Sequence, residues 1–243
     1  FEQNPNKTQY ITDVDFNGDY AVAIDINQPM PVLLEYNNKE MLLFLSPGNR
    51  LELNFDNLDF YNSMEFSGLG FNDNSFIHRY ILKYGMRDVF KEVIVFPSIS
   101  VADSIYNRMN ELSPDDFTRY IAEHQNSERQ FYENDPIQGD LSLELKAYYE
   151  AMVTYKWAGY LFAYANMRQK RNEVMPDEFY IFLWDLEISS DEAIMQPAYG
   201  AFLDIYLDYA FKSMHGDSIT DKIQKFALMF ELAEMQLSGF AEE

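Results

Sequence analysis

The feature that most constrains this chain is a change of hydrophobic periodicity near residue 70. Before that point, apolar side chains alternate with polar ones or form short runs between turn residues. After it, they recur at steps of four and three, as on one face of a helix. The longest such stripe comprises Leu141, Leu145, Tyr148, Met152, Tyr155, Gly159 and Phe162. We therefore expect an α+β fold, with an antiparallel β-sandwich-like module over 1–71 and an all-helical module over 72–243.

Six segments of the N-terminal part have the length and pattern of strands. Turn residues separate them, among them Asn17-Gly18, Asn37-Asn38 and Pro47-Gly48, which tolerate the backbone angles of tight hairpins. Short strands joined by short turns favour an antiparallel sandwich or small barrel. The expected strands are Thr8–Phe16, Tyr20–Ile26, Val32–Tyr36, Met41–Leu45, Arg50–Phe55 and Ser63–Phe66.

The rest of the chain predicts helices. Ser113 followed by Pro114 and two acids is a helix start, and Ser218 to Asp221 has the same capping logic. The sequence has no self-similar repeat, so a helical repeat array is not expected. No low-complexity linker separates the two modules, which indicates that they pack against each other. The expected helices cover 72–84, 100–112, 114–132, 140–171, 176–188, 197–214 and 218–237.

Composition excludes several classes of function. Forty acidic residues against 18 basic ones give a formal charge of -22, which repels phosphate backbones and anionic lipid headgroups. Nucleic acid is therefore not an expected partner, and no apolar run is long enough to insert this chain into a membrane. With no cysteine, the chain has no disulfide, no thiolate metal site and no cysteine nucleophile. We expect no cofactor.

Two local motifs resemble ligand sites. Asp13–Asp19 matches the first half of a calcium loop, but Ile24 occupies the position of the closing glutamate, so a hairpin turn with solvated acids is favoured over a calcium site. The segment from Phe66 to Phe71 could form a phosphate cradle. It lacks the residues of a Walker or Rossmann loop, and a strand exit needing positive φ is favoured. His124 and Glu128, spaced i and i+4, are interpreted as solvated surface partners.

We assign no catalytic residue and expect no enzyme activity from this chain. The number of aromatic residues is high, with 18 Tyr, 20 Phe and two Trp, and many fall in the 140–171 and 197–214 helices. Packing within a helical bundle is the simplest interpretation, while a docking surface and sugar stacking are the alternatives. The candidate interaction surface consists of Tyr148, Tyr155, Trp157, Tyr160 and Tyr164.

The stretch from Asp13 to Tyr84 resembles a known family. It contains Asp15-Phe16-Asn17-Gly18-Asp19-Tyr20, Leu43-Phe44-Leu45-Ser46-Pro47-Gly48-Asn49 and Met64-Glu65-Phe66-Ser67-Gly68. These segments resemble the N-terminal region of TlpA-like thioredoxin-family proteins of Bacteroidetes, in which a β-rich module and a helical region precede a thioredoxin domain. Asn49 stands where that family usually has aspartate, and the family's Cys-x-x-Cys centre has no counterpart here.

The resemblance implies a non-catalytic accessory or interaction region of an exported thioredoxin-family protein, in the periplasm or cell envelope. It also implies a downstream thioredoxin domain or an envelope protein as partner, and an upstream lipid anchor, as in an outer-membrane lipoprotein. A stand-alone envelope protein that binds a sugar or peptide through aromatic-rich helices is the alternative. A hydrolase with a dispersed acid pair is a third hypothesis.

Overall fold

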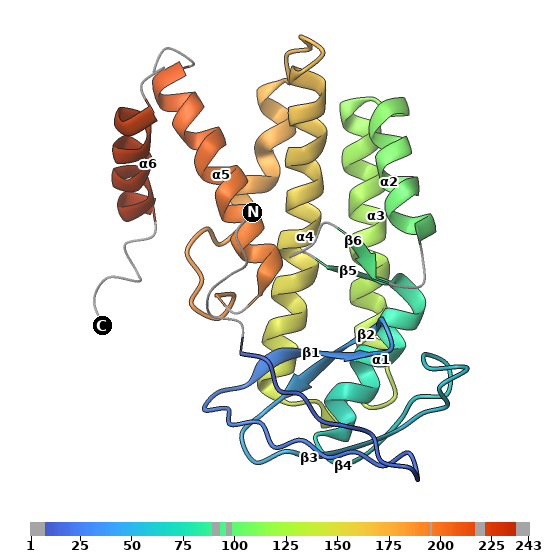
Figure 1. The fold of residues 1–243 in the computed structure, drawn as a ribbon. Coiled ribbons are helices and arrows are strands. Elements are labelled where there is room, and N and C mark those ends of the chain that lie inside the picture. Colours follow the sequence, from blue (N-terminus) through green and yellow to red (C-terminus); the bar gives the residue numbers. More distant parts are fainter. Residues whose placement is uncertain (1–7, 89–92, 96–98, 195, 217–221, 237–243) are drawn as a thin grey trace.

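The computed structural model describes residues 8–88, 93–95, 99–194, 196–216 and 222–236 (Figure 1). Small antiparallel sheets lie at one end of the molecule, and a mostly helical region follows in the chain. The expected α+β class is confirmed, with helix dominating. None of the described helices combines the length and apolar character that spanning a bilayer requires.

The β half consists of two hairpin-like pairs. β1 (Met30–Tyr36) pairs with β2 (Lys39–Leu45) in antiparallel register, and the turn between them uses Asn37 and Asn38 at φ of 49° and 60°. This is the backbone that tight hairpins require. β3 (Arg50–Asn54) pairs with β4 (Glu65–Leu69) in the second sheet. Gly48 of the Pro-Gly turn also has a positive φ, 82°, so both turns occur where they were expected.

The first two expected strands are wrong. Thr8–Phe16 and Tyr20–Ile26 form no strand, and many of their side chains are exposed, Phe16 almost completely. Only the turn between them is as expected, because the Asp15 carboxylate accepts the backbone N–H groups of Asn17 and Asp19 at 2.8 and 2.9 Å. An alternating pattern makes a strand only where a neighbouring edge offers hydrogen bonds, so the expected sandwich is reduced to two small sheets.

The helices agree closely with the sequence prediction. They are α1 (Phe71–Tyr84), α2 (Ile99–Glu111), α3 (Pro114–Glu133), α4 (Leu143–Gln169), α5 (Pro197–His215) and α6 (Lys222–Gln236). Ser113 caps α3 as expected, since its hydroxyl accepts the N–H of Asp116 at 3.2 Å. The expected cap at Ser218–Asp221 lies outside the described residues.

Four elements were not predicted as they occur. The helix expected over 176–188 is a 3₁₀ helix, η2 (Asp177–Asp185), and a short one, η1 (Gln138–Asp140), precedes α4. Two strands of three residues, β5 (Met86–Asp88) and β6 (Val93–Val95), pair within the helical half. They are too short to change the fold class.

One core joins the two halves. Met41, Phe44 and Phe60 from the β half lie in the same buried cluster as Phe76 and Tyr149 from the helices. α4 lies in the middle of the helical half, between α3 and α5 (Figure 1). A second cluster fills the space between α4 and α5, with Tyr155, Phe162, Tyr199 and Phe202 among its members. The two halves therefore pack together, as the absence of a linker indicated.

Candidate functional site

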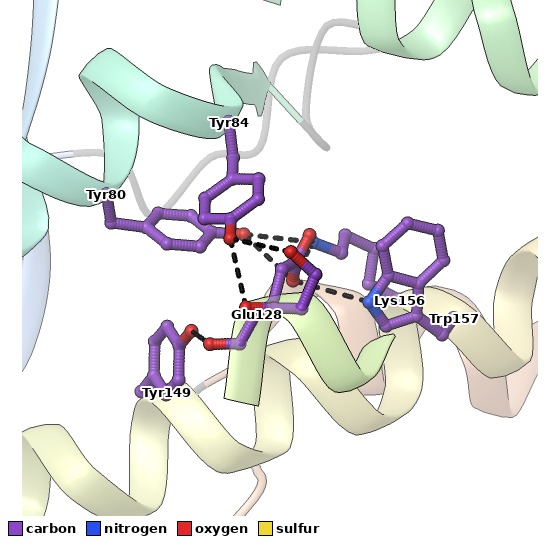
Figure 2. Close-up of polar contacts among 7 residues, drawn as sticks. Tyr80, Tyr84, Glu128, Tyr149, Lys156 and Trp157 are labelled. Atoms are coloured by element: carbon purple, nitrogen blue, oxygen red, sulfur yellow. Dashed lines mark hydrogen bonds and ion pairs between the residues drawn. The ribbon is translucent and has the colours of Figure 1, made fainter. Parts of the chain in front are cut away.

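The interior of the helical half contains a polar cluster centred on Glu128 of α3 (Figure 2). The Glu128 side chain is 4% exposed. Its two carboxylate oxygens accept hydrogen bonds from Lys156 Nζ at 2.7 and 2.6 Å, and one of them also accepts from Tyr80 Oη at 3.2 Å and Trp157 Nε1 at 3.3 Å. The donors come from α1 and α4, so one carboxylate connects three helices.

The groups around this carboxylate are also bonded to one another. Lys156 Nζ donates to Tyr80 Oη at 2.9 Å, and Tyr149 Oη donates to the main-chain oxygen of Glu128 at 2.7 Å. Tyr84 Oη donates to the main-chain oxygen of Ser127 at 3.0 Å. A buried polar network of this kind is favourable only when its members have partners. The central members do.

Burial sets the ionisation of this cluster. It raises the pKa of Tyr80 well above its usual value, and the negative charge of Glu128 raises it further. Burial also lowers the pKa of Lys156, an effect that the adjacent Glu128 carboxylate opposes. Glu128 already accepts four donor contacts from Lys156, Tyr80 and Trp157, so its oxygens are engaged with the protein itself. We conclude that the cluster fixes the arrangement of the three helices. Its carboxylate is not arranged to exchange a proton with a bound substrate.

The interpretation of His124 and Glu128 as solvated surface partners is wrong. Glu128 is buried and bound to Lys156. The His124 ring contacts the rings of Tyr120 and Trp157, with centroid distances of 4.4 and 5.8 Å. Burial lowers the pKa of His124, although Glu128 and Glu123 pull in the opposite direction. The spacing of the pair was correct for one helix face, but the sequence did not show that α4 covers that face.

The structure places the candidate interaction surface in the core. Tyr148, Tyr155, Trp157, Tyr160 and Tyr164 are at most 8% exposed. The hydroxyl of Tyr155 donates to the Glu187 main-chain oxygen at 2.7 Å, and that of Tyr164 donates to the Leu112 main-chain oxygen at 2.8 Å. Because α4 has neighbours on several sides, its aromatic residues pack on all faces. These five side chains are packing residues here and offer no exposed docking face.

Exposed apolar surface lies instead between η2 and α5. A groove of about 330 Å³ runs there, and Trp184 beside it is 84% exposed. Met214, on the α5 side, is 58% exposed. The sequence carried a signal for this surface, since four consecutive apolar residues, 181–184, cannot all face a core from a helix. The groove is lined by Leu183, Trp184, Ile188, Tyr206, Tyr209, Ala210, Ser213 and Met214.

Acidic residues alternate in the chain with the groove residues on the η2 side. Asp185 follows Trp184 directly and is exposed, as is Glu187 on the other side of Leu186. A second hollow, of about 320 Å³, is lined by Glu187, Ser189, Ser190, Asp191 and Glu192. The η2 side of the aromatic groove and the carboxylate-lined hollow thus come from one stretch of chain, residues 183–192, while α5 supplies the other side of the groove.

The motifs considered as ligand sites have structural roles. Asp15 organises its own turn, and Gly68 and Gly70 have φ of 80° and 98°, as expected for a strand exit. Within the described ranges, no three or more histidine, aspartate or glutamate side chains come together as a metal site would require.

Comparison of the chain with models of known protein families, with characterised proteins and with solved structures found no match in any of the three. The thioredoxin-family resemblance therefore stays a prediction that depends on the quoted motifs.

Proposed function

We propose that this chain is a non-catalytic interaction module, accessory to a thioredoxin-family thiol–disulfide oxidoreductase of the cell envelope. The observation that carries the proposal is the 84% exposure of Trp184 beside the apolar groove between η2 and α5. Tryptophan is enriched among the residues that dominate protein interfaces, and exposed apolar patches commonly mark such sites. The groove takes the place of the buried α4 aromatics as the contact surface.

The roles of the family-like motifs support an accessory module. Asn49 Oδ1 accepts the N–H of Ser46 at 2.8 Å and closes the turn before β3. Gly68 passes so close to the Arg50 main-chain oxygen that a side chain would not fit there. Asn74 bonds α1 to β2. These residues build the scaffold, which suits a protein whose reactive thiols belong to a downstream domain or to an envelope partner.

Site-specific photocrosslinking tests this function. A benzophenone amino acid at position 184, in the full-length protein in its native cells, should give an adduct with a domain that contains Cys-x-x-Cys. If that domain follows in the same polypeptide, the adduct is intramolecular and is mapped by peptide mass spectrometry. The matched control is the same substitution at Leu58, which is 91% exposed in the β half. Equal adducts from both positions, or a partner without a thioredoxin fold, would contradict the proposal.

A second candidate is a stand-alone envelope protein that binds a sugar or a peptide. Its support is that Trp184, Tyr206 and Tyr209 line a single groove, and that Glu187, Asp191 and Glu192 line a second hollow. Aromatic faces with nearby hydrogen-bonding groups suit a sugar ring. Binding of a defined glycan, lost in Trp184→Ala and kept in Leu58→Ala, would favour this candidate over docking to an oxidoreductase.

A further inference from the structure

A long stretch of the chain that contributes to the groove contains acidic residues and no basic ones. Between Arg171 and Lys212 there is no lysine, arginine or histidine. The nine acids in this interval are Glu173, Asp177, Glu178, Asp185, Glu187, Asp191, Glu192, Asp204 and Asp208. The interval contains η2 and most of α5, the two elements that form the groove. Lys212 and His215 flank the groove residues Ser213 and Met214 at the end of α5, and Lys212 pairs with Asp208 at 2.6 Å. Acidic residues still outnumber basic ones in the elements that form the groove, so a partner meets a net negative surface.

Four of these acids follow Trp184 within eight residues, and three of them line the second hollow. Asp185, Glu187, Asp191 and Glu192 are all exposed. None of the four forms an ion pair with a basic side chain in the described part of the chain. We call them the acidic rim. Because no cation among the described side chains is paired with them, their charges can act across an interface.

We propose that the groove binds a basic amphipathic polypeptide segment, with apolar side chains in the groove and lysine or arginine on the acidic rim. This inference rests on the proposed function and specifies the chemistry of the partner. Like charges facing each other across an interface are costly, so the acidic rim selects against acidic partners. A cation beside Trp184 also gains from the face of the exposed indole ring.

The size of the groove fits apolar anchors. Its volume of about 330 Å³ is at the lower end of the range of about 300–1,000 Å³ for small-ligand sites, which leaves room for a few side chains. A second copy of this chain is a poor occupant, because a symmetric contact would bring two acidic rims together. Phosphate-bearing partners are repelled by the same charges.

Tryptophan fluorescence gives a direct test. Trp157 is 2% exposed and Trp184 is 84% exposed, so the red-shifted part of the emission comes from Trp184. The probe is a short peptide of leucine and lysine with leucines at helical spacing. It should shift the emission to the blue as Trp184 is covered. A leucine–glutamate peptide of the same pattern should produce no shift, and a serine–lysine peptide should bind at least about tenfold more weakly.

Variants identify the site of binding. Trp184→Ala should weaken leucine–lysine peptide binding, measured by calorimetry, by about tenfold or more, while Leu58→Ala should leave it unchanged. The rim variant Glu187→Gln/Asp191→Asn/Glu192→Gln should weaken binding and reduce its salt dependence. A matched variant, Glu123→Gln/Glu133→Gln/Glu144→Gln, changes net charge equally at exposed positions of α3 and α4. If both triple variants weaken binding equally, net charge acts instead of the groove and the inference is wrong.

The two proposals fail separately. If the leucine–glutamate peptide binds as well as the leucine–lysine peptide, the basic occupant is wrong, even where position 184 crosslinks to a thioredoxin domain. If the leucine–lysine peptide binds through Trp184 but position 184 crosslinks to an unrelated protein, the thioredoxin role fails and the basic occupant stands. If no peptide covers Trp184, the inference is overturned.

Discussion

Glu128 and Lys156 illustrate how much a single pair of residues can determine in this protein. Both belong to a network that spans α1, α3 and α4, and the carboxylate is 4% exposed. Bringing two charges into a protein interior is costly, and their attraction and hydrogen bonds offset that cost only while both are present. The pair therefore specifies how the helices meet more than it adds to net stability.

Removing one charge of this pair should be much worse than removing both. Lys156→Met leaves the Glu128 carboxylate buried without its cation, and we expect a loss of about 3–5 kcal/mol in the free energy of unfolding. The double variant Lys156→Met/Glu128→Leu should recover a large part of that loss. Urea denaturation measures both. The control is Arg129→Met, which breaks an exposed pair with Glu150 and should cost less than about 1 kcal/mol. A similar cost for the two single variants would contradict this account.

His124 should make stability depend on pH. Its pKa in the folded protein is lowered from 6.5 by burial, so the unfolded chain binds the proton more readily. The free energy of unfolding should therefore fall as pH decreases through 6.5, and this loss should end below the folded pKa. His124→Phe keeps a ring against Tyr120 and Trp157 and removes the titration. Its stability, measured by denaturation between about pH 8 and pH 5, should fall less than that of the unchanged protein. If the stability of the two proteins changed with pH in the same way, His124 would not be the source of the pH dependence.

At the scale of elements, the sequence predicted helices better than strands. α1 to α5 begin and end within a few residues of the expected positions, because periodicity and caps are local signals. Strand pairing depends on which edges are available, and that information is not local. The interior polar cluster and the groove were missed for the same reason. Glu128 and Lys156 are separated by 28 residues, and the groove exists only where η2 meets α5.

Asn74 supplies hydrogen bonds to the backbone of strand β2. Its side-chain amide donates to the Phe44 main-chain oxygen and its oxygen accepts the Phe44 N–H, both at 2.9 Å, so one side chain on α1 takes the place of a neighbouring strand. Asn74 is 1% exposed. Asn74→Ala leaves these backbone groups without partners and should cost about 1–3 kcal/mol by urea denaturation. The exposed Asn62→Ala should change stability by less than about 0.5 kcal/mol. If the two variants lost equal stability, the contact of Asn74 with β2 would contribute nothing to the free energy of unfolding.

A comparison of Gly68 and Gly18 distinguishes the cost of backbone strain from the cost of a steric clash. Both have positive φ, 80° and 92°, but a Cβ on Gly68 would lie 2.1 Å from the Arg50 oxygen, whereas one on Gly18 meets nothing within 4 Å. Gly18→Ala should cost about 1–3 kcal/mol from φ alone. Gly68→Ala should cost clearly more, because β3 and β4 must move apart. Thermal or urea unfolding of both variants measures the difference, and a smaller loss for Gly68→Ala would refute the close-contact argument.

The charge of -22 is a property of the whole molecule. A large net charge opposes the compact state through self-repulsion, and nine of the acids fall in the single interval between Arg171 and Lys212. The buried pair of Glu128 and Lys156 is screened only slightly by salt, since it lies away from solvent. Screening therefore acts mainly on the unfavourable surface repulsions. Salt weakens both the stabilising ion pairs and the destabilising repulsion between surface acids. We expect the weakening of the repulsion to be the larger effect on the free energy of unfolding.

Raising the salt concentration from about 0.01 M to about 0.15 M shortens the Debye length from about 30 Å to about 8 Å. We expect the free energy of unfolding to rise over this range, and urea titrations in sodium chloride measure it. The rim variant Glu187→Gln/Asp191→Asn/Glu192→Gln removes part of the repulsion, so it should depend less on salt than the unchanged protein. Calcium chloride at equal ionic strength should add little, because Asp15 uses its carboxylate to hold its own turn. A fall in stability with sodium chloride would mean that favourable ion pairs dominate. A large gain in stability that is specific to calcium, and is lost in Asp15→Ala, would identify a calcium site at that turn.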